Sequence, residues 1–459
     1  MVLPSSGAID TQAIETEFQL GTAVTKRLSN DLGPLIAITA TTTISQGSSF
    51  YGKAYGQAVT SITQGTTTSS SITLNWSGGA GATSFSITST PATTTQTASA
   101  SGYNFTGLAA STAYTFTIVS KNAQGVSGGS ATSGSFTTSP SSPVNITGVV
   151  TTFAGTYNVA GTVDGTGTAA QFAYPRHIIT DGAGNLYVSQ FDAQNLRKIV
   201  ISTKAVTTIA TGLRIYGMAY DGAGNIYYAT FLGGTVRKYN LNTNTDSFIA
   251  GSGATGFADG TGAGAVFNYP LFVAYYAGNL YVTDIENHRI RKVTTAGVVT
   301  TLAGNGTDAS VDGTGTGASF SHPYGIVSDG AGNLYNVDER GRCVRKTVIS
   351  TGVVTTIAGL ANTGGFVDGV GSAARFNYPN ALDIDPTATY LYIADNNNSS
   401  VRKIVISTNT VSTPAGTNTS GYVDATGSAA RFNIPFAVCV AGSTLYVNDY
   451  FNQLIRAVT

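Results

Sequence analysis

The feature that most constrains this chain is a repeat that fills residues 145–459. A segment of the NLYV type recurs six times, and successive copies lie 40, 54, 54, 57 and 54 residues apart. Each repeat holds about four short β-like stretches joined by turns such as GAGN, where glycine supplies positive φ. Six such repeats predict an all-β fold in the form of a six-bladed β-propeller. The second position of the segment is Leu186, Ile226, Leu280, Leu334, Leu391 and Leu445 in the six copies.

The two ends of the repeat array complement each other. The last repeat stops at LIRAVT and lacks the fourth stretch, VVTTIAG. The missing stretch stands before the first repeat instead, as VVTTFAG at residues 149–155. Because an open propeller would expose two sheet edges, we expect residues 149–155 to pair with the strand around Ile455 and close a domain spanning 149–459.

The repeat resembles the NHL family. The resemblance covers all six repeats and rests on DGTGTAAQFAYP (164–175), DGVGSAARFNYP (368–379) and the NLYV and IRK stretches. It implies the fold but no activity, because NHL propellers include binding proteins, lyases and lactonases.

Residues 59–139 predict a small β-sandwich. Ile72, Leu74 and Trp76 alternate on one face of a strand, as do the apolar residues of AYTFTI. The segment resembles fibronectin type III domains, with Trp76 as the core tryptophan and Tyr114 as the tyrosine of the corner. Residues 140–148, rich in Ser and Pro, are expected to form a linker.

Residues 1–58 fit neither module. The pattern LPSSGAIDTQAIETEF, followed by ISQGSSFYGK, resembles the N-terminal segment of tailed-phage appendage proteins. The resemblance implies that this segment attaches the protein to other virion proteins. The matching positions proposed for attachment are Leu3, Pro4, Ile9, Ile14, Phe18, Phe50 and Tyr51.

Charge and composition exclude several classes of protein. The chain has 23 basic and 23 acidic residues among 459 and no basic run, so nucleic-acid binding is not expected. No apolar run is long enough for membrane insertion, and MVLPSSGAID lacks the basic and apolar regions of a secretory signal. Cys343 and Cys439 fall in different repeats, so we expect two free, packed thiols.

The search for chemistry predicts no catalytic site, metal or cofactor. The DGxG loop and the third-strand arginine recur from blade to blade, so we assign both a structural role, the arginine in an ion or carbonyl contact between blades. FNYP and its variants are interpreted as packing between blades. The three histidines, His177, His288 and His322, occupy non-equivalent positions and are not expected to converge on zinc.

The blades differ most in the loops that follow the NLYV strand. Functional residues favour such loops, so a partner is expected on this face. The candidate contacts are Asp284, Asn287, His288, Arg289, Glu339, Arg340, Arg342, Asn397 and Tyr450.

The sequence therefore predicts a non-enzymatic virion protein of a tailed phage, such as a tail or neck fibre, assembled in the host cytoplasm. Its propeller would bind a host surface glycan or another virion protein, and a homo-oligomer is left open. Two alternatives remain. One is a bacterial cell-surface or secreted adhesin. The other is a metal-dependent propeller lyase or hydrolase, which would need His, Asp or Glu side chains converging on a metal.

Overall fold

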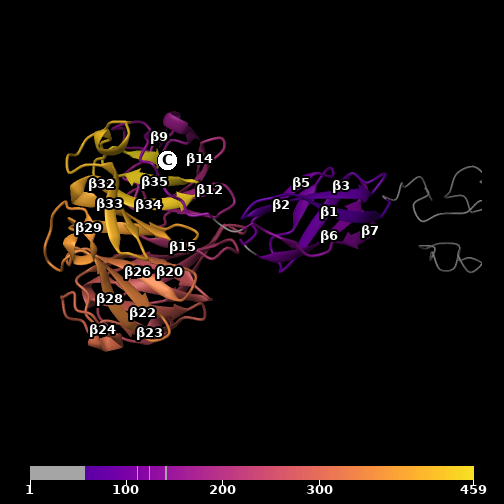
Figure 1. Ribbon diagram of the computed structural model, residues 1–459. Coiled ribbons are helices and arrows are strands. Elements are labelled where there is room, and N and C mark those ends of the chain that lie inside the picture. Colours follow the sequence, from indigo (N-terminus) through magenta and orange to yellow (C-terminus); the bar gives the residue numbers. More distant parts are fainter. Residues whose placement is uncertain (1–56, 111, 124, 140–141) are drawn as a thin grey trace, which may run out of the picture. The chain divides into compact units, whose positions relative to one another are not determined.

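The computed structural model describes residues 57–459 apart from 111, 124, 140 and 141. The chain divides into two compact units, Met1–Pro140 and Ser141–Thr459 (Figure 1). The seven positions proposed for virion attachment lie outside the described residues. Helical structure in the described part consists of three-residue 3₁₀ turns, and none of these could cross a membrane.

The first unit is a two-sheet β-sandwich. One sheet has the order β1-β2-β5 and the other β4-β3-β6-β7, with β8 also paired to β6. The strands are β1 (Val59–Thr67), β2 (Ser71–Gly78), β3 (Ser84–Thr90), β4 (Gln96–Ala98), β5 (Tyr103–Thr106), β6 (Ala113–Lys121), β7 (Ser127–Thr132) and β8 (Phe136–Thr137).

Alternation along the strands builds the core of the sandwich. Side chains at every second position of β2 and β6 are buried, as the sequence predicts. The Trp76 ring packs against Phe85 with 5.0 Å between centroids. The Tyr114 hydroxyl accepts a hydrogen bond from the Ala109 amide at 2.9 Å, which forms the predicted tyrosine corner.

The second unit consists of six antiparallel sheets, one per blade. Blade 1 has β10 (Gly165–Thr166), η1 (Gly167–Ala169), β11 (His177–Thr180), β12 (Asn185–Gln190), β13 (Asn195–Val200) and β14 (Ala205–Thr211). Blade 2 has β15 (Met218–Tyr220), β16 (Asn225–Thr230), β17 (Thr235–Asn240) and β18 (Thr245–Ala250). Blade 3 has β19 (Gly260–Thr261), η2 (Gly262–Gly264), β20 (Pro270–Tyr276), β21 (Asn279–Asp284), η3 (Ile285–Asn287), β22 (Arg289–Thr294) and β23 (Val298–Ala303).

The other three blades follow the same plan. Blade 4 has β24 (Gly313–Thr314), η4 (Gly315–Gly317), β25 (Pro323–Ser328), β26 (Asn333–Asp338), β27 (Cys343–Val348) and β28 (Val353–Ala358). Blade 5 has β29 (Gly369–Val370), η5 (Gly371–Ala373), β30 (Pro379–Ile384), β31 (Tyr390–Asp395), η6 (Asn396–Asn398), β32 (Ser400–Val405) and β33 (Thr410–Gly416). Blade 6 has η7 (Gly427–Ala429), β34 (Pro435–Ala441), β35 (Thr444–Asp449), β36 (Leu454–Val458) and, as its outer strand, β9 (Val150–Ala154).

The ring is closed both at its centre and at its seam. The innermost strands contact one another in the order β11, β15, β20, β25, β30 and β34, and β34 contacts β11 again. At the seam, β9 pairs antiparallel with β36, with Ile455 opposite Ala154 and Val458 opposite Val150 (Figure 1). No blade therefore presents an unpaired strand where the array begins and ends.

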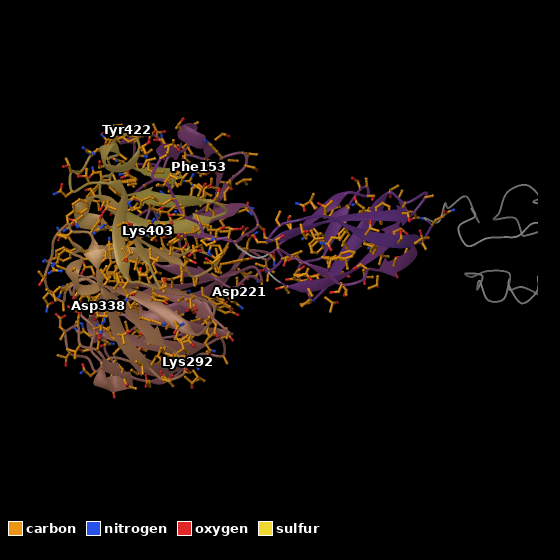
Figure 2. All side chains as sticks on the ribbon, viewed as in Figure 1. Phe153, Asp221, Lys292, Asp338, Lys403 and Tyr422 are labelled. Carbon is orange, nitrogen blue, oxygen red and sulfur yellow. The ribbon has the colours of Figure 1, made fainter. Side chains whose placement is uncertain are left out.

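A buried arginine in the third strand ties each of five blades to the loop that leads into it. In blade 4, Arg345 contacts the buried Asp338 at 2.7 Å and Asp312 of the DGTG loop at 3.0 Å. Asp338 is labelled in Figure 2. Asp312 also accepts a hydrogen bond from Thr356 of the outer strand at 2.8 Å. The equivalent arginines are Arg197, Arg291, Arg402 and Arg456, each with no exposed surface.

This arrangement corrects one detail of the sequence interpretation. The arginines do make ion pairs and carbonyl contacts, but within their own sheet and its entry loop, not with the neighbouring blade. The aspartate of the DGxG loop bonds that arginine and the outer strand, as Asp164 does with Arg197 and Thr208. Blade 2 has no DGxG loop, and its Arg237 pairs instead with Asp246 in the same sheet.

The two aromatic residues of the FNYP motif have separate roles. The Phe ring is buried beneath the buried arginine, and Phe376 lies 5.0 Å from the Arg402 guanidinium carbon. The Tyr reaches the preceding blade, where Tyr269 packs 4.8 Å from Phe231 and Tyr378 lies under Arg342 at 4.8 Å.

Both thiols, Cys343 and Cys439, are free and buried, as predicted.

Replacing Arg345 by Ala is expected to lower the free energy of unfolding by about 3–5 kcal/mol, because Asp338 would remain buried without its partner. Arg237 occupies the same strand position but is 31% exposed, so Arg237→Ala should cost less than about 1 kcal/mol. Denaturant unfolding of both variants measures the difference. Equal losses would contradict the structural role assigned to the buried pair.

Candidate functional site

A pocket of about 510 Å³ opens where the first strands begin and the second strands end. Five blades contribute to its lining, and the side chains are mostly aromatic or charged. The lining residues are Arg176, Phe191, Tyr216, Phe231, Ile285, Glu286, His322, Tyr324, Glu339, Arg340 and Tyr378. The volume and the mixture of rings with a few charged groups are typical of a small-molecule site.

Arg176 organises one side of this pocket. Its guanidinium carbon lies 4.8 Å from the Tyr216 ring centroid and 5.0 Å from that of Tyr450, with Phe191 and Phe436 also within cation–π range. Its Nη1 donates a hydrogen bond of 2.9 Å to the Tyr216 hydroxyl, which in turn contacts the Tyr324 hydroxyl. The rings therefore hold the positive charge in a fixed position at the pocket wall.

Two of the predicted contact residues line the pocket, and a third supports it. Burial raises the pKa of Glu339 to about 7, even though Arg340 and Arg342 act in the opposite direction. Arg340 is exposed at the rim, with 53% of its side chain accessible. Tyr450 packs on Arg176 and, at 5.3 Å, on Phe436.

The structure gives other predicted contacts a role inside the fold. Asp284 is fully buried and pairs with Arg291 at 2.6 Å, and Asn287 bonds Asp284 at 2.8 Å. Arg289 donates to the carbonyls of Asn287 and Asn305 and lies over Phe257.

Arg342 and Asn397 also lie outside the pocket lining. Arg342 stacks on Tyr378 across a blade junction, where it is only indirectly part of the pocket wall. Asn397 is exposed on blade 5 and does not line the pocket.

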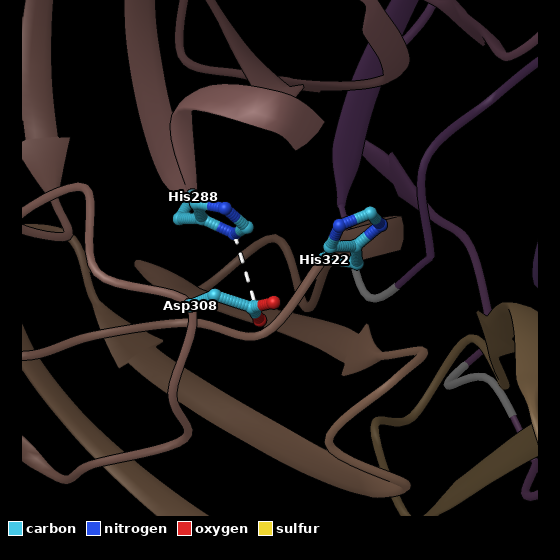
Figure 3. A group of neighbouring side chains, drawn as sticks. All are labelled: His288, Asp308 and His322. Atoms are coloured by element: carbon cyan, nitrogen blue, oxygen red, sulfur yellow. Dashed lines mark ion pairs between the residues drawn. The ribbon is translucent and has the colours of Figure 1, made fainter.

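The prediction that the histidines stay apart is wrong for two of them. His288 and His322 lie with their ring centroids 5.2 Å apart, and Asp308 completes the group (Figure 3). The Ser321 hydroxyl donates to Asp308 at 2.6 Å. Burial alone would raise the pKa of Asp308, but this hydrogen bond and the nearby His288, His322 and Arg340 lower it.

His177 lies elsewhere, on the innermost strand of blade 1. It lines a second cavity of about 210 Å³ bounded by the first strands of all six blades. Its Nδ1 accepts a hydrogen bond from the Met218 amide at 3.2 Å, and burial lowers its pKa to about 3. His177 is therefore a neutral side chain packed in the centre of the ring.

Asp383 is a titrating group in this second cavity. Its carboxylate accepts hydrogen bonds from the amides of Ile384 at 2.9 Å and Val440 at 2.7 Å, the latter on blade 6. Burial nevertheless raises its pKa from 3.8 to about 6.

The raised pKa means that the folded protein binds a proton on Asp383 more tightly than the unfolded chain does. The resulting stability is present below pH about 4 and is lost as the pH rises through about 6. Asp383→Asn should make the free energy of unfolding fall less between pH 4.5 and 7.5 than it does in the parent protein. Denaturant titrations of both proteins at the two pH values test this. If the free energy of unfolding changes equally between the two pH values in both proteins, the raised pKa assigned to Asp383 is contradicted.

Several pocket residues were not predicted from the sequence. Arg176 and Tyr324 immediately follow the proline that ends the DGxG–YP segment, and Tyr216 holds a similar place before β15. At this position the repeats carry Arg176, Leu271, Tyr324, Asn380 and Phe436. This variation in residue type, at a position that is otherwise regular, could have indicated the pocket from the sequence. The residues after the proline begin the strands that surround the pocket.

Six antiparallel blades closed into a ring place the second unit in the β-propeller class. Comparison with known families and proteins then specifies both units. The model of the family "Fibronectin type III domain" matches residues 57–153. This match runs into β9, which the structure assigns to the propeller.

The propeller is similar to NHL-repeat proteins. NHL repeat-containing protein 2 of Bos taurus is 32% identical over 29% of this chain. Protein SUPPRESSOR OF QUENCHING 1, chloroplastic, of Arabidopsis thaliana is 27% identical over 45% of it. This chain covers 20% and 21% of these relatives, about a fifth of their length. The chain thus joins a β-sandwich that matches the fibronectin type III model to a β-propeller that is similar to NHL-repeat proteins.

Solved structures support the same architecture. A protein of unknown function from Bacteroides thetaiotaomicron aligns over 87% of this chain and 98% of its own, with TM-score 0.55 and 19% identity. An auxiliary nutrient binding protein from Bacteroides ovatus aligns over the same shares with TM-score 0.55 and 14% identity. At such identities the likeness concerns the fold alone.

Proposed function

We propose that this protein is a non-enzymatic recognition protein whose propeller binds a surface glycan in the pocket lined by Arg176, Tyr216 and Glu339. The observation that carries the proposal is the composition of that pocket. Aromatic rings can pack against the apolar C–H faces of a sugar, and a few fixed charged groups can bond its hydroxyls. Positively and negatively charged side chains both line the pocket wall, so the pocket can distinguish one orientation of the bound sugar from another.

The arrangement of the pocket favours a rigid binding site. Arg176 is held by four rings and by the Tyr216 hydroxyl, so little side-chain freedom remains to be lost when a ligand binds. A glycan is preferred over another virion protein as the ligand because the site is a concave pocket, whereas protein partners usually cover a larger and flatter surface.

We further propose that the protein is a tail or neck fibre-like appendage of a tailed phage, attached to other virion proteins through residues 1–58. The support is the resemblance of LPSSGAIDTQAIETEF and ISQGSSFYGK to such attachment segments. The fibronectin type III domain would then act as a spacer between the attachment segment and the propeller. Many copies on one particle would convert weak glycan contacts into useful avidity.

The glycan proposal is tested with a panel of immobilised bacterial surface polysaccharides and oligosaccharides. The full chain should bind at least one member. Arg176→Ala and Phe231→Ala should each weaken that binding at least tenfold, because both remove pocket contacts. Lys292→Ala is the matched control, since it removes a positive charge from β22 that does not line the pocket. Failure of every saccharide to bind, or pocket variants that bind like the parent, would refute the proposal.

The virion proposal is tested by a particle experiment. Virions from the presumed phage source are purified with a tagged full-length chain and, separately, with a chain lacking residues 1–58. Mass spectrometry and electron microscopy should detect the full chain in particles and not the truncated one. Particles without the full chain would reject the virion role and favour an adhesin on a bacterial surface.

A further inference from the structure

Three side chains with metal-binding chemistry meet at the junction between blades 3 and 4. His288 follows η3 in blade 3, Asp308 lies in the loop between the blades, and His322 precedes β25 in blade 4. One potential ligand atom from each lies within 4.8 Å of the others, and His288 Nδ1 is 3.9 Å from Asp308 Oδ1. Figure 3 shows the Asp308 carboxylate directed toward the space between the two imidazole rings.

The backbone at this junction is not special, because the same positions recur around the ring. The residue after the second strand's turn has positive φ at Gln194, His288, Arg342, Ser399 and Gln453. The residue before the first strand's proline has positive φ at Tyr174, Tyr269, His322, Tyr378 and Ile434. At other junctions this pairing gives Gln453 bonded to the Tyr174 amide at 2.7 Å, or Arg342 stacked on Tyr378.

The side chains, by contrast, are special at this one junction. Asp308 forms an isolated β-bridge with Phe320 in the loop before blade 4. In the loop before blade 3, the residue that forms the equivalent β-bridge, with Phe267, is Thr255. Among these recurring positions, imidazoles face each other only between blades 3 and 4. Their convergence therefore comes from substitution and does not follow from the repeat itself.

One atom of the group is unsatisfied. His288 Nδ1 is buried and has no hydrogen-bond partner among the described residues. A buried polar atom without a partner costs free energy, and a coordinated cation would remove that cost. The His288 and His322 side chains are 12% and 5% exposed, so both are already ordered by the surrounding fold.

We propose that His288, Asp308 and His322 bind one divalent transition metal ion of the zinc class. Two imidazole nitrogens and one carboxylate oxygen form a donor set typical of zinc, whereas magnesium and calcium prefer oxygen ligands. Bond lengths of about 2.0–2.2 Å require the three ligand atoms to draw closer together than the 4.8 Å within which they lie here. This site goes beyond the proposed glycan recognition, which needs no metal.

The surroundings determine how such a site would operate. Three protein ligands leave a fourth position for water or for an oxygen of the pocket's ligand, and His322 also lines the pocket. Glu286 lies 3.8 Å from His322 Nε2, where a carboxylate can orient a metal-bound imidazole. Arg340 lies 3.9 Å from Asp308 and opposes a cation, although its side chain is exposed and free to move away.

Metal binding by the full chain, prepared without a histidine tag, tests the proposal. The chain has three histidines and two buried cysteines, so competing zinc sites are few. Calorimetric titration with zinc chloride should give one saturable site. The double variant His288→Gln/His322→Tyr recreates side chains found at other junctions, so it should fold normally and bind zinc at least 100-fold more weakly.

Two further variants separate coordination from a general change in the fold. Asp308→Asn should weaken zinc binding at least tenfold, whereas Arg340→Ala should strengthen it because an opposing charge is removed. Thermal unfolding of each variant without metal checks the fold. Absence of saturable zinc binding by the parent chain, or parent-like binding by the folded double variant, would overturn the site. Magnesium binding tighter than zinc would overturn the assignment of metal class. These titrations contain no saccharide, so their outcome is independent of the glycan test.

Discussion

The buried arginine of the third strand is the interaction on which the propeller most depends. In blades 3 to 6 its guanidinium joins a buried aspartate at the end of the second strand to the aspartate of the entry loop, as Arg345 does with Asp338 and Asp312. In blade 1, Gln190 takes the place of the buried aspartate. The entry loop leads into the innermost strand, so this one cation contacts both the end of the second strand and the loop that precedes the first strand. The buried ion pairs thus help to fix the geometry of the face that holds the pocket.

The repeat made the fold readable from the sequence. The length of the repeat, the number of strands in it and the missing last strand can all be read directly from the sequence. They are sufficient to predict that Val150–Ala154 pairs with Leu454–Val458. The side-chain network was harder to anticipate. Repetition indicated that Arg345 and its equivalents are structural, but it could not distinguish a contact within the blade from one between blades, since both repeat equally.

The candidate site was only partly accessible to the same reasoning. Variation among loops drew attention to Glu339 and Arg340, which line the pocket. It also selected Asp284 and Asn287, whose polarity serves the buried network, because a polar loop residue looks the same in sequence whether it is buried or exposed. The pairing of His288 with His322 escaped detection because their positions are non-equivalent within one repeat yet adjacent across two neighbouring repeats.

That adjacency has a consequence for how such a ring can diversify. At three boundaries between blades, a residue that ends one repeat's turn contacts a residue that precedes the next repeat's first strand, and both residues have positive φ. The three pairs are His288 with His322, Arg342 with Tyr378, and Gln453 with Tyr174. A change of side chain at these places alters neighbouring chemistry without requiring a new loop. The ring therefore has pairs of residue positions, related by rotation about its axis, at which side chains can change at one boundary without affecting the others. Such a pair can stack, form a hydrogen bond or bind a ligand, while the backbone stays the same.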